Sequence, residues 1–335
     1  MGSLKLHKAN PIAQYAQPDT SSRDRSTSLP PAMINTAHPP LASRSQRTAA
    51  GTAAVSSDVA KQVSVHFWGV RGSVPTPSAA NQRYGGNTLC TEISIGGQRI
   101  IFDSGTGIVS LGQHLQQQKD VVKAHILFTH TQWDRIQGFP FFQPAFFPHN
   151  HFTVYGGTAP NGASIKHCLT DQMLQPHYTM PLQNMLARLT FKTLSDRTRF
   201  NIGDIEVNVL KINPVTEALG YRLSYHGYSL VYATDTPNGP RDPQADDIFL
   251  ELADSADILI YDGTYSDLRY LHHNQADTDE PRWETGIDIA KEANVKKLVL
   301  VHHSPVQNDT VLDQLQKDIS DRFPAATVAY EGMVL

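Results

Sequence analysis

From residue 63 onward, short apolar runs alternate with clusters of Gly, Pro and Asp. Runs of roughly four to eight residues that are rich in β-branched and aromatic side chains predict strands. The predicted strands are Val63–Trp68, Cys90–Ile95, Gln98–Phe102, Ala124–Phe128, His151–Tyr155, Leu189–Thr193, Ile205–Ile212, Ala218–Tyr225, Tyr228–Ala233, Ile258–Tyr261, Lys297–Val301 and Thr327–Tyr330. Helical periodicity predicts helices over Val109–Gln118, Ala163–Leu174, Asp246–Ala253, Trp283–Ala293 and Thr310–Arg322. Since the strands come in groups that are each closed by helices, we expect an α+β protein with two mixed sheets packed together and helices outside.

Several of the predicted strands run into a carboxylate or an imidazole. Binding and catalytic groups of sheet-based folds gather beyond strand ends, on loops that a rigid scaffold holds. Any one of these aspartates alone is explained as well by a turn that ends its strand. We interpret the whole set as one polar rim. Its members are Asp103, His130, Asp235, Asp262 and the pair His302-His303.

The segment Ile126–Gly138 is the most informative one in the chain. A binuclear metal hydrolase would carry His-x-His-x-Asp-His at this place, and the sequence reads His130-x-Gln132-x-Asp134-Arg135. An amide oxygen is a poor zinc ligand, and a guanidinium stays protonated and cannot coordinate a metal. The spacing therefore indicates a metal site in which two ligands have been replaced.

Composition separates the first residues from the rest. Residues 1–61 are dominated by Ser, Pro, Ala, Thr and Arg, which predicts a disordered N-terminal tail ahead of one folded domain over residues 62–335. Few acidic residues beside several arginines also fit an organelle transit peptide, as an alternative to a plain flexible tail. No apolar run approaches the ~20 residues that cross a bilayer. We expect a cytoplasmic protein with no membrane association, and an organelle as the alternative location.

Charge and cysteine content narrow the classes of partner. The formal net charge is -4 and the pI about 6.4, so nucleic acid is not expected as a partner, although a local basic surface would not be visible in that sum. The two cysteines, Cys90 and Cys168, lie far apart and outside any C-x-x-C spacing. Neither a disulfide framework nor a cysteine zinc site is indicated.

Beyond the His130 segment, several blocks of the chain resemble a known family. They are His66-Phe-Trp-Gly-Val-Arg71-Gly-Ser73-Val-Pro75, Tyr84-Gly-Gly-Asn87-Thr88, Phe102-Asp103-Ser-Gly105-Thr-Gly107, Gln137-Gly-Phe-Pro-Phe-Phe142, Ala218-Leu-Gly-Tyr221-Arg222, Tyr232-Ala-Thr-Asp235-Thr236 and Tyr330-Glu-Gly-Met333. In this order they resemble the metallo-β-lactamase fold, in its branch of bacterial phosphodiesterase-like hydrolases, over roughly residues 64–335. The resemblance implies a four-layer αββα sandwich and two zinc, manganese or iron ions that activate a water to attack a phosphodiester.

The same resemblance shows where this chain departs from the family. The first metal would be held by three histidines, of which His130 remains while Gln132 and Pro214 stand at the other two positions. For the second metal, Asp134, Asp235 and His302 match. Arg135 replaces its histidine, and Glu280 replaces a further histidine that branch members often carry.

Arg135 decides what the remaining ligands can hold. A guanidinium beside a metal ion in a partly buried site would repel it by several kcal/mol at an effective dielectric of about 20. The alternative is that Arg135 itself neutralises Asp134 and Asp235, with a fork that matches carboxylate geometry. We expect this internal ion pair, and hence no cofactor, or at most one divalent zinc, manganese or iron ion.

Two further groups of residues have both a functional and a structural interpretation. Arg71, Ser73 and Asn87 resemble the family's substrate-facing loops, where main-chain N–H groups and the guanidiniums of Arg71 and Arg135 would hold an anion. A Gly-rich turn that packs the first hairpin explains these loops equally well. His149, His151, His272 and His273 are either relocated ligands or, more commonly, surface histidines.

The sequence therefore predicts a pseudoenzyme with a degenerate metal site. Its expected role is to bind an anionic, nucleotide-like small molecule or a protein partner. The alternative is a mononuclear metal-dependent phosphodiesterase-type hydrolase that uses Asp134, Asp235 and His302, with Asp134 and Asp235 as catalytic residues.

Overall fold

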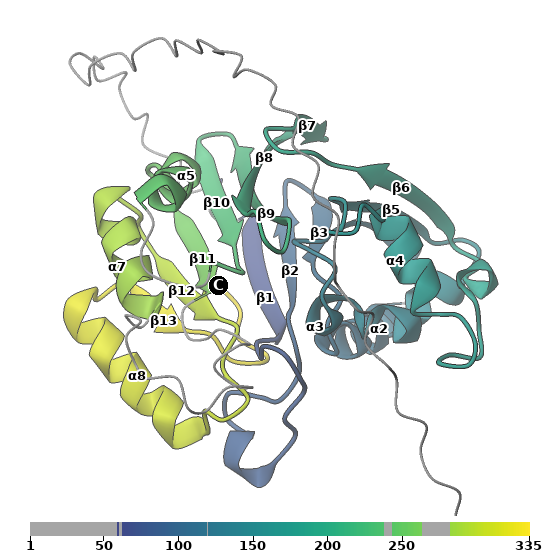
Figure 1. Ribbon diagram of the computed structural model, residues 1–335, viewed down its shortest axis with the longest axis horizontal. Coiled ribbons are helices and arrows are strands. Elements are labelled where there is room, and N and C mark those ends of the chain that lie inside the picture. Colours follow the sequence, from purple (N-terminus) through teal and green to yellow (C-terminus); the bar gives the residue numbers. More distant parts are fainter. Residues whose placement is uncertain (1–58, 60–61, 119, 238–242, 263–281) are drawn as a thin grey trace, which may run out of the picture. The chain divides into compact units, whose positions relative to one another are not determined.

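The computed structural model describes residue 59 and residues 62–118, 120–237, 243–262 and 282–335 (Figure 1). The chain divides into two units, Met1–Gly51 and Thr52–Leu335, and all the described residues belong to the second. Except for Val59, the predicted tail of residues 1–61 lies outside them. The boundary between tail and domain stays a prediction.

The first sheet has the order β1-β2-β3-β4-β5-β6. β1 to β3 pair antiparallel, and β3 to β6 pair parallel. Parallel neighbours need a crossover, and α2 (Gly107–Gln117) supplies it between β3 and β4. The strands are β1 (Val63–Gly69), β2 (Cys90–Ile95), β3 (Gln98–Phe102), β4 (Lys123–Leu127), β5 (His151–Gly156) and β6 (Arg188–Thr193).

The second sheet has the order β13-β12-β11-β10-β9-β8-β7. Its first half in sequence is an antiparallel meander, and β10 to β13 run parallel. The strands are β7 (Arg199–Ile202), β8 (Ile205–Asn213), β9 (Ala218–Tyr225), β10 (Tyr228–Ala233), β11 (Ile258–Asp262), β12 (Leu298–Val301) and β13 (Ala326–Val328). The helices between the parallel strands are α5 (Pro243–Ala253), α7 (Arg282–Glu292) and α8 (Asp309–Arg322).

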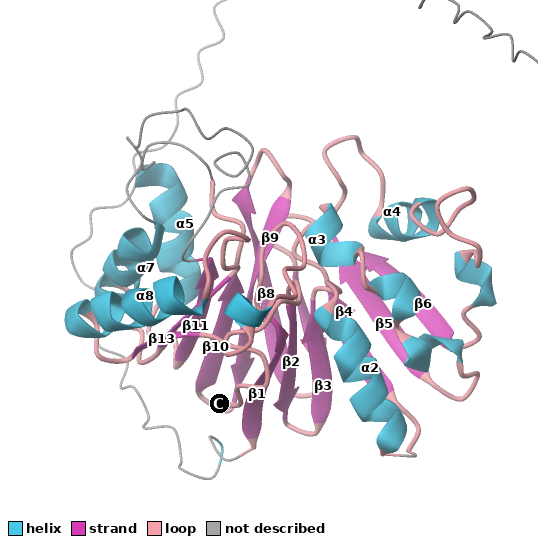
Figure 2. Cartoon of the chain, turned by 90° about the horizontal axis from the view of Figure 1, so that it is seen from below, coloured by secondary structure: helices cyan, strands magenta, loops and turns pink. Residues whose placement is uncertain are grey.

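Three apolar clusters produce the layers. The two sheets bury one cluster between them, where Phe102 of β3 stacks on Tyr232 of β10 with ring centroids 4.4 Å apart. A second cluster lies between the second sheet and α5, α7 and α8, and a third between the first sheet, α2 and α4 (Ile165–Asp171). Figure 2 shows helices on the outer side of each sheet. The predicted four-layer αββα sandwich is confirmed.

Two short elements of the structure, β7 and α3 (Trp133–Ile136), were not predicted from the sequence. β7 has only four residues and α3 makes a single helical turn, so neither is long enough to show a periodic pattern. The 3-10 segments Ala79–Asn81, Phe139–Phe141, Gln143–Phe146 and Leu182–Asn184 were missed for the same reason. The omission of α3 matters, because this turn presents Asp134 and Arg135 to the site.

Close packing of main chain sets the position of α3. A Cβ atom on Gly138 would lie 2.1 Å from the carbonyl oxygen of Gly105, so only glycine permits this approach. Gly138 N donates to Ser104 O, and Ser104 N donates to Arg135 O. The turn after β3 and the one-turn helix α3 are thereby fixed against each other.

Candidate functional site: a buried arginine among strand-end carboxylates

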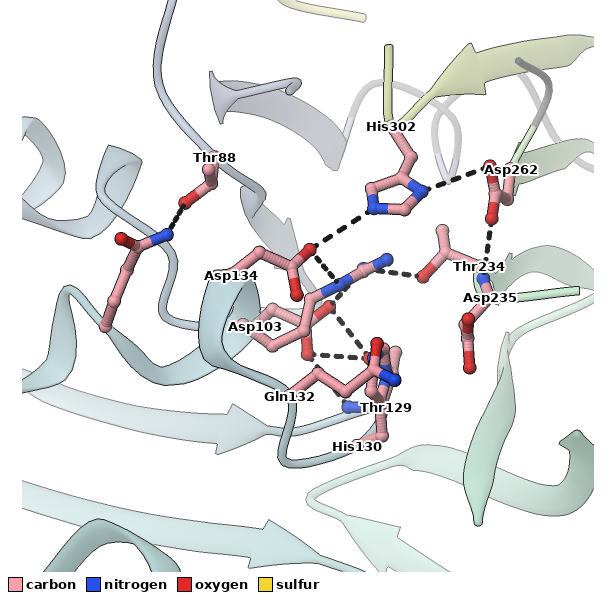
Figure 3. A network of polar contacts seen from close by, with 12 residues as sticks. Thr88, Asp103, Thr129, His130, Gln132, Asp134, Thr234, Asp235, Asp262 and His302 are labelled. Carbon is pink, nitrogen blue, oxygen red and sulfur yellow. Dashed lines mark hydrogen bonds and ion pairs between the residues drawn. The ribbon is translucent and has the colours of Figure 1, made fainter. Parts of the chain in front are cut away.

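The structure brings the strand-end residues into one network. Asp103 follows β3, Asp262 ends β11 and His302 follows β12, and α3 adds Asp134 and Arg135 (Figure 3). Asp103, Asp235 and His302 all have positive φ angles, of 58°, 74° and 64°. Left-handed backbone at non-glycine residues is rare and clusters at built sites.

Arg135 lies at the centre of this network and is fully buried. Its Nη1 donates to Asp103 Oδ2 at 3.0 Å and to Thr234 Oγ1 at 2.9 Å, and its Nε lies 3.0 Å from Asp134 Oδ2. Burial works to lower the pKa of Arg135, but the Asp134 and Asp103 carboxylates outweigh burial and raise it. The guanidinium is thus a fixed positive charge held by two buried carboxylates.

The ion pair corrects part of the sequence interpretation. Arg135 was expected to neutralise Asp134 and Asp235, and the structure pairs it with Asp134 and Asp103. Asp235 is half-buried, and its Oδ2 accepts hydrogen bonds from Thr216 Oγ1 and Asn213 Nδ2. The carboxylate of Asp235 is therefore held by the last residue of β8 and by the loop that follows it.

Asp103 also organises the end of β4. Its Oδ1 accepts from Thr129 N and Thr129 Oγ1, both at 2.9 Å. Thr129 Oγ1 lies 3.0 Å from His130 Nδ1, and His130 Nε2 lies 3.0 Å from Gln132 Oε1. Since the Thr129 hydroxyl hydrogen points to Asp103, the hydrogen between Thr129 and His130 belongs to His130 Nδ1. The other ring nitrogen of His130 faces Gln132, one of the two replaced ligand positions.

His302 is held between two carboxylates. Its Nε2 lies 3.2 Å from Asp134 Oδ2 and its Nδ1 lies 3.2 Å from Asp262 Oδ1. Burial works to lower the pKa of His302, but Asp262 and Asp134 outweigh burial and raise it to about 10. The same contacts act on Asp134, where Arg135 and His302 outweigh burial and lower the pKa of the carboxyl. His302 is therefore a second cation in the network at neutral pH.

Asp103, Asp262, Thr129 and Thr234 were absent from the site residues that the sequence singled out. The sequence marks the two aspartates only as strand-end members of the polar rim. Their position at the end of a strand is the signal by which they could have been recognised as site residues. Conversely, Pro214 is exposed in the loop after β8, and the neighbouring Asn213 makes the contact to Asp235.

Arg71, Ser73 and Asn87 lie in loops tied to the C-terminal part of the chain. Arg71 is fully buried, and its guanidinium donates to the carbonyl oxygens of Gly85, Ser304 and Gln307. Asn87 donates to Glu331 through its main-chain N and its Nδ2, and Ser73 is half-buried. Their role in ligand binding stays a prediction.

The glycine-rich loop around residues 83–87 is held by carboxylates of the protein itself. Asp309 accepts from the main-chain N of Arg83 at 2.9 Å and of Tyr84 at 3.2 Å, and Glu331 accepts from Asn87 N. Internal carboxylates thus occupy N–H groups that an anionic ligand would need.

We expect Asp309→Ala to destabilise the chain by about 1–3 kcal/mol, because it leaves two N–H groups at a largely buried position without an acceptor. Asp313→Ala is the control, since Asp313 pairs with Arg83 at a position where both side chains are well exposed, and such pairs contribute about 0–1 kcal/mol. Urea denaturation measures both, and hydrogen exchange of residues 83–88 should accelerate in Asp309→Ala alone.

The family that the sequence resembles implies metal ions, and the side chains here do not fit a binuclear metal centre. Among the described residues, no group of three or more His, Cys, Asp or Glu side chains is arranged to hold a metal ion. Asp134, which would coordinate a metal, is instead bonded to Arg135 and His302, and Asp235 is bonded to Asn213 and Thr216. Two protein cations in contact with Asp134 would repel a divalent ion at this position.

Comparison with known proteins agrees with the fold. Residues 98–303 match the family model described as the beta-lactamase superfamily domain. The chain belongs to the beta-lactamase superfamily. Within the superfamily it has the metallo-β-lactamase fold and phosphodiesterase-like relatives, as the sequence predicted. No curated protein sequence matches the chain.

Three solved structures illustrate the shared fold of the superfamily. The metallo-beta-lactamase fold protein YhfI from Bacillus subtilis is 19% identical, covers 82% of this chain and 98% of its own, and has a TM-score of 0.57. A diphosphatase from the PhnP family is 15% identical over 82% of this chain and 97% of its own, with a TM-score of 0.55. The short form of human tRNase Z is 17% identical over 81% of this chain and 98% of its own, with a TM-score of 0.53.

The remaining histidines of interest do not join the network in the described part of the chain. His149 and His151 are exposed near the start of β5, whereas the site lies beyond the ends of the parallel strands. His272, His273 and Glu280 lie outside the described residues. None of the helices in the described ranges has the length and hydrophobicity needed to cross a bilayer.

Proposed function

We propose that this superfamily member is a pseudoenzyme in which Arg135 replaces the catalytic metal. The observation that carries the proposal is the fully buried guanidinium bonded to Asp103 and 3.0 Å from Asp134. A charge-assisted, buried arrangement of this kind holds the carboxylates in place without a metal ion. The hydrolytic water would then lack the Lewis acid that activates it in metal-dependent relatives.

The retained role in this proposal is binding. Of the two expected ligand classes, the loop contacts favour a protein partner over an anionic small molecule, because Asp309, Glu331 and main-chain carbonyls already use the donors of the anion-facing loops. Exposed apolar side chains stand on α3 and on two loops, and all three segments also carry site contacts. Trp133 is 60% exposed, Val215 78% and Val306 64%. Apolar side chains around a site support protein binding.

The alternative, a mononuclear hydrolase that uses Asp134, Asp235 and His302, requires these three side chains to share one ion. In the structure Asp134 contacts His302, whereas Asp235 bonds to Asn213 and Thr216. The alternative therefore needs Asp235 to leave its partners and Arg135 to leave Asp134.

The proposal is tested by metal analysis of the purified full chain after dialysis against zinc, manganese and iron. We expect substoichiometric metal and no hydrolysis of bis(p-nitrophenyl) phosphate above the buffer rate. One tightly held ion per chain, with turnover that Asp235→Asn abolishes, would establish the mononuclear hydrolase and overturn the pseudoenzyme.

A further inference from the structure

The second feature of interest is a basic surface on the first sheet, remote from the Arg135 network. It lies on the strands β4, β5 and β6, on the face opposite to the helices α2 and α4. The pairing register places nine side chains there in three rows across the strands. The rows are Lys123, His151 and Arg188; His125, Thr153 and Thr190; and Leu127, Tyr155 and Lys192.

Side-chain alternation fixes which face these residues occupy. Ala124 of β4, Val154 of β5 and their alternating neighbours belong to the cluster under α2 and α4. The residues between them must therefore point to the other side of the sheet. On that side the second sheet packs near Tyr155, where Phe200 of β7 stacks on the tyrosine ring at 4.9 Å. The other two rows, further from β7, are exposed or half-buried.

Charge on this face has one sign. Lys123, Arg188 and Lys192 are exposed, and none of them forms an ion pair with any described residue. None of the nine positions is a carboxylate. Elsewhere in the described chain other lysines have carboxylate partners, as Lys211 does with Glu217 and Lys296 with Asp257. The net charge of -4 therefore hides a local positive surface.

Uncharged donors lie between the cations. Burial, followed by the charge of Lys192, lowers the pKa of His125, so that its imidazole is neutral at pH 7 and bonds to the Tyr155 hydroxyl at 3.2 Å. Thr153 and Thr190 add hydroxyl groups in the same row. Phosphate oxygens are bound by this combination of Lys, Arg and hydroxyl donors.

Edge protection alone does not explain the pattern. Edge strands carry Lys and Arg to prevent pairing with other chains, and Arg188 and Lys192 lie on β6, the last strand of the sheet. Lys123, however, lies on β4, two strands in from that edge. Its exposed position in the same row as Arg188 extends the cationic surface across the sheet.

We propose that the surface formed by Lys123, Arg188 and Lys192 with the threonines between them binds the phosphate backbone of a single-stranded nucleic acid. A sheet face suits a single strand, because a flexible single-stranded backbone can follow rows of cations across it. An acidic peptide is disfavoured, since the nine positions offer no exposed apolar side chain as an anchor. The phenol ring of Tyr155 is buried and cannot stack on bases, so we expect phosphate contacts to dominate and binding to depend little on sequence.

The test is fluorescence anisotropy of the full chain with a labelled 20-nucleotide oligouridine at low salt. Three cation–phosphate contacts predict a slope of about -2 in a plot of log affinity against log salt concentration. The variant Lys123→Gln, Arg188→Gln, Lys192→Gln should lose roughly tenfold or more in affinity and most of that slope. These are exposed positions, so the fold and the Arg135 network should be unaffected.

The matched control is Lys291→Gln, Lys297→Gln, Lys317→Gln, which removes the same charge near α7, β12 and α8. Retention of wild-type affinity by this control supports the proposal. Equal losses of affinity in both variants would mean that the overall charge of the chain governs binding, and would overturn the proposal. Failure of oligouridine to bind at low salt, or tighter binding of poly-glutamate of equal charge than of oligouridine, would also overturn it.

Discussion

Replacement of Arg135 by methionine is expected to lower the free energy of unfolding by about 3–5 kcal/mol, because it leaves two buried carboxylates without their cation. Asp103 is fully buried and Asp134 is 2% exposed, so water cannot solvate either charge in the folded chain. Asp103 would retain only the Thr129 and main-chain donors, and Asp134 only His302. Methionine keeps the apolar stem but lacks the guanidinium, so the loss combines the missing charge with the small cavity that the planar group leaves.

Chemical denaturation with urea, followed by circular dichroism, gives the difference between the variant and the wild type. Arg83→Met is the control, since it breaks the pair with Asp313 in which the two side chains are 59% and 41% exposed; its expected cost is at most about 1 kcal/mol. Adding Asp103→Asn to Arg135→Met should recover part of the loss, because one uncompensated charge is removed. Arg135→Met with a stability within the range of the control would show that the carboxylates do not depend on this guanidinium.

Strand positions and the shared rim were accessible from the sequence because both depend on local pattern. Alternation of β-branched and aromatic residues located most strands to within one or two residues, and the polar residue after each strand marked the edge of the sheet. His130, Asp262 and His302 then follow from the geometry of parallel strands, whose carboxyl ends meet at one edge of each sheet.

The carboxylate that pairs with Arg135 could not be predicted from the sequence in the same way. Asp103 and Asp235 are both strand-end aspartates, and they belong to different sheets. Which of them meets Arg135 depends on how α3 is seated against the turn after β3, through contacts such as Gly138 N to Ser104 O. A one-turn helix has no periodic signal, so its direction is set by tertiary packing alone.

Two cations of the protein itself lie beside the strand-end carboxylates of this chain. A metal centre would supply positive charge to them from outside the protein; here Arg135 and the protonated His302 supply it from within. These two cations contact Asp103, Asp134 and Asp262 at 3.0–3.2 Å. Internal cations cannot be removed by a chelator. We therefore expect the stability of the chain to be indifferent to EDTA, whereas a chain that relied on a structural ion would lose stability.

Restoring the two replaced ligand positions should bring metal binding back. In the variant Gln132→His, Arg135→His, the guanidinium that repels a divalent ion is gone, and two imidazoles stand beside His130, Asp134 and His302. We expect uptake of at least one zinc ion per chain by elemental analysis, and a protein that EDTA now destabilises. Zinc at about 100 times its Kd should stabilise this variant by about 2.7 kcal/mol, while leaving the wild type unchanged.

The control for this gain is Gln132→His, Arg135→Gln, which removes the same positive charge without supplying the second imidazole. If that variant takes up zinc as well as the double-histidine variant does, the lost charge rather than the ligand set governs binding. If neither variant takes up zinc, the loops no longer place their side chains around a common metal position. The presence of Arg135 in place of a histidine then cannot by itself explain the degenerate site. Uptake by the double-histidine variant only would mean that the carboxylates are still placed for a metal, and that Arg135 is what excludes it.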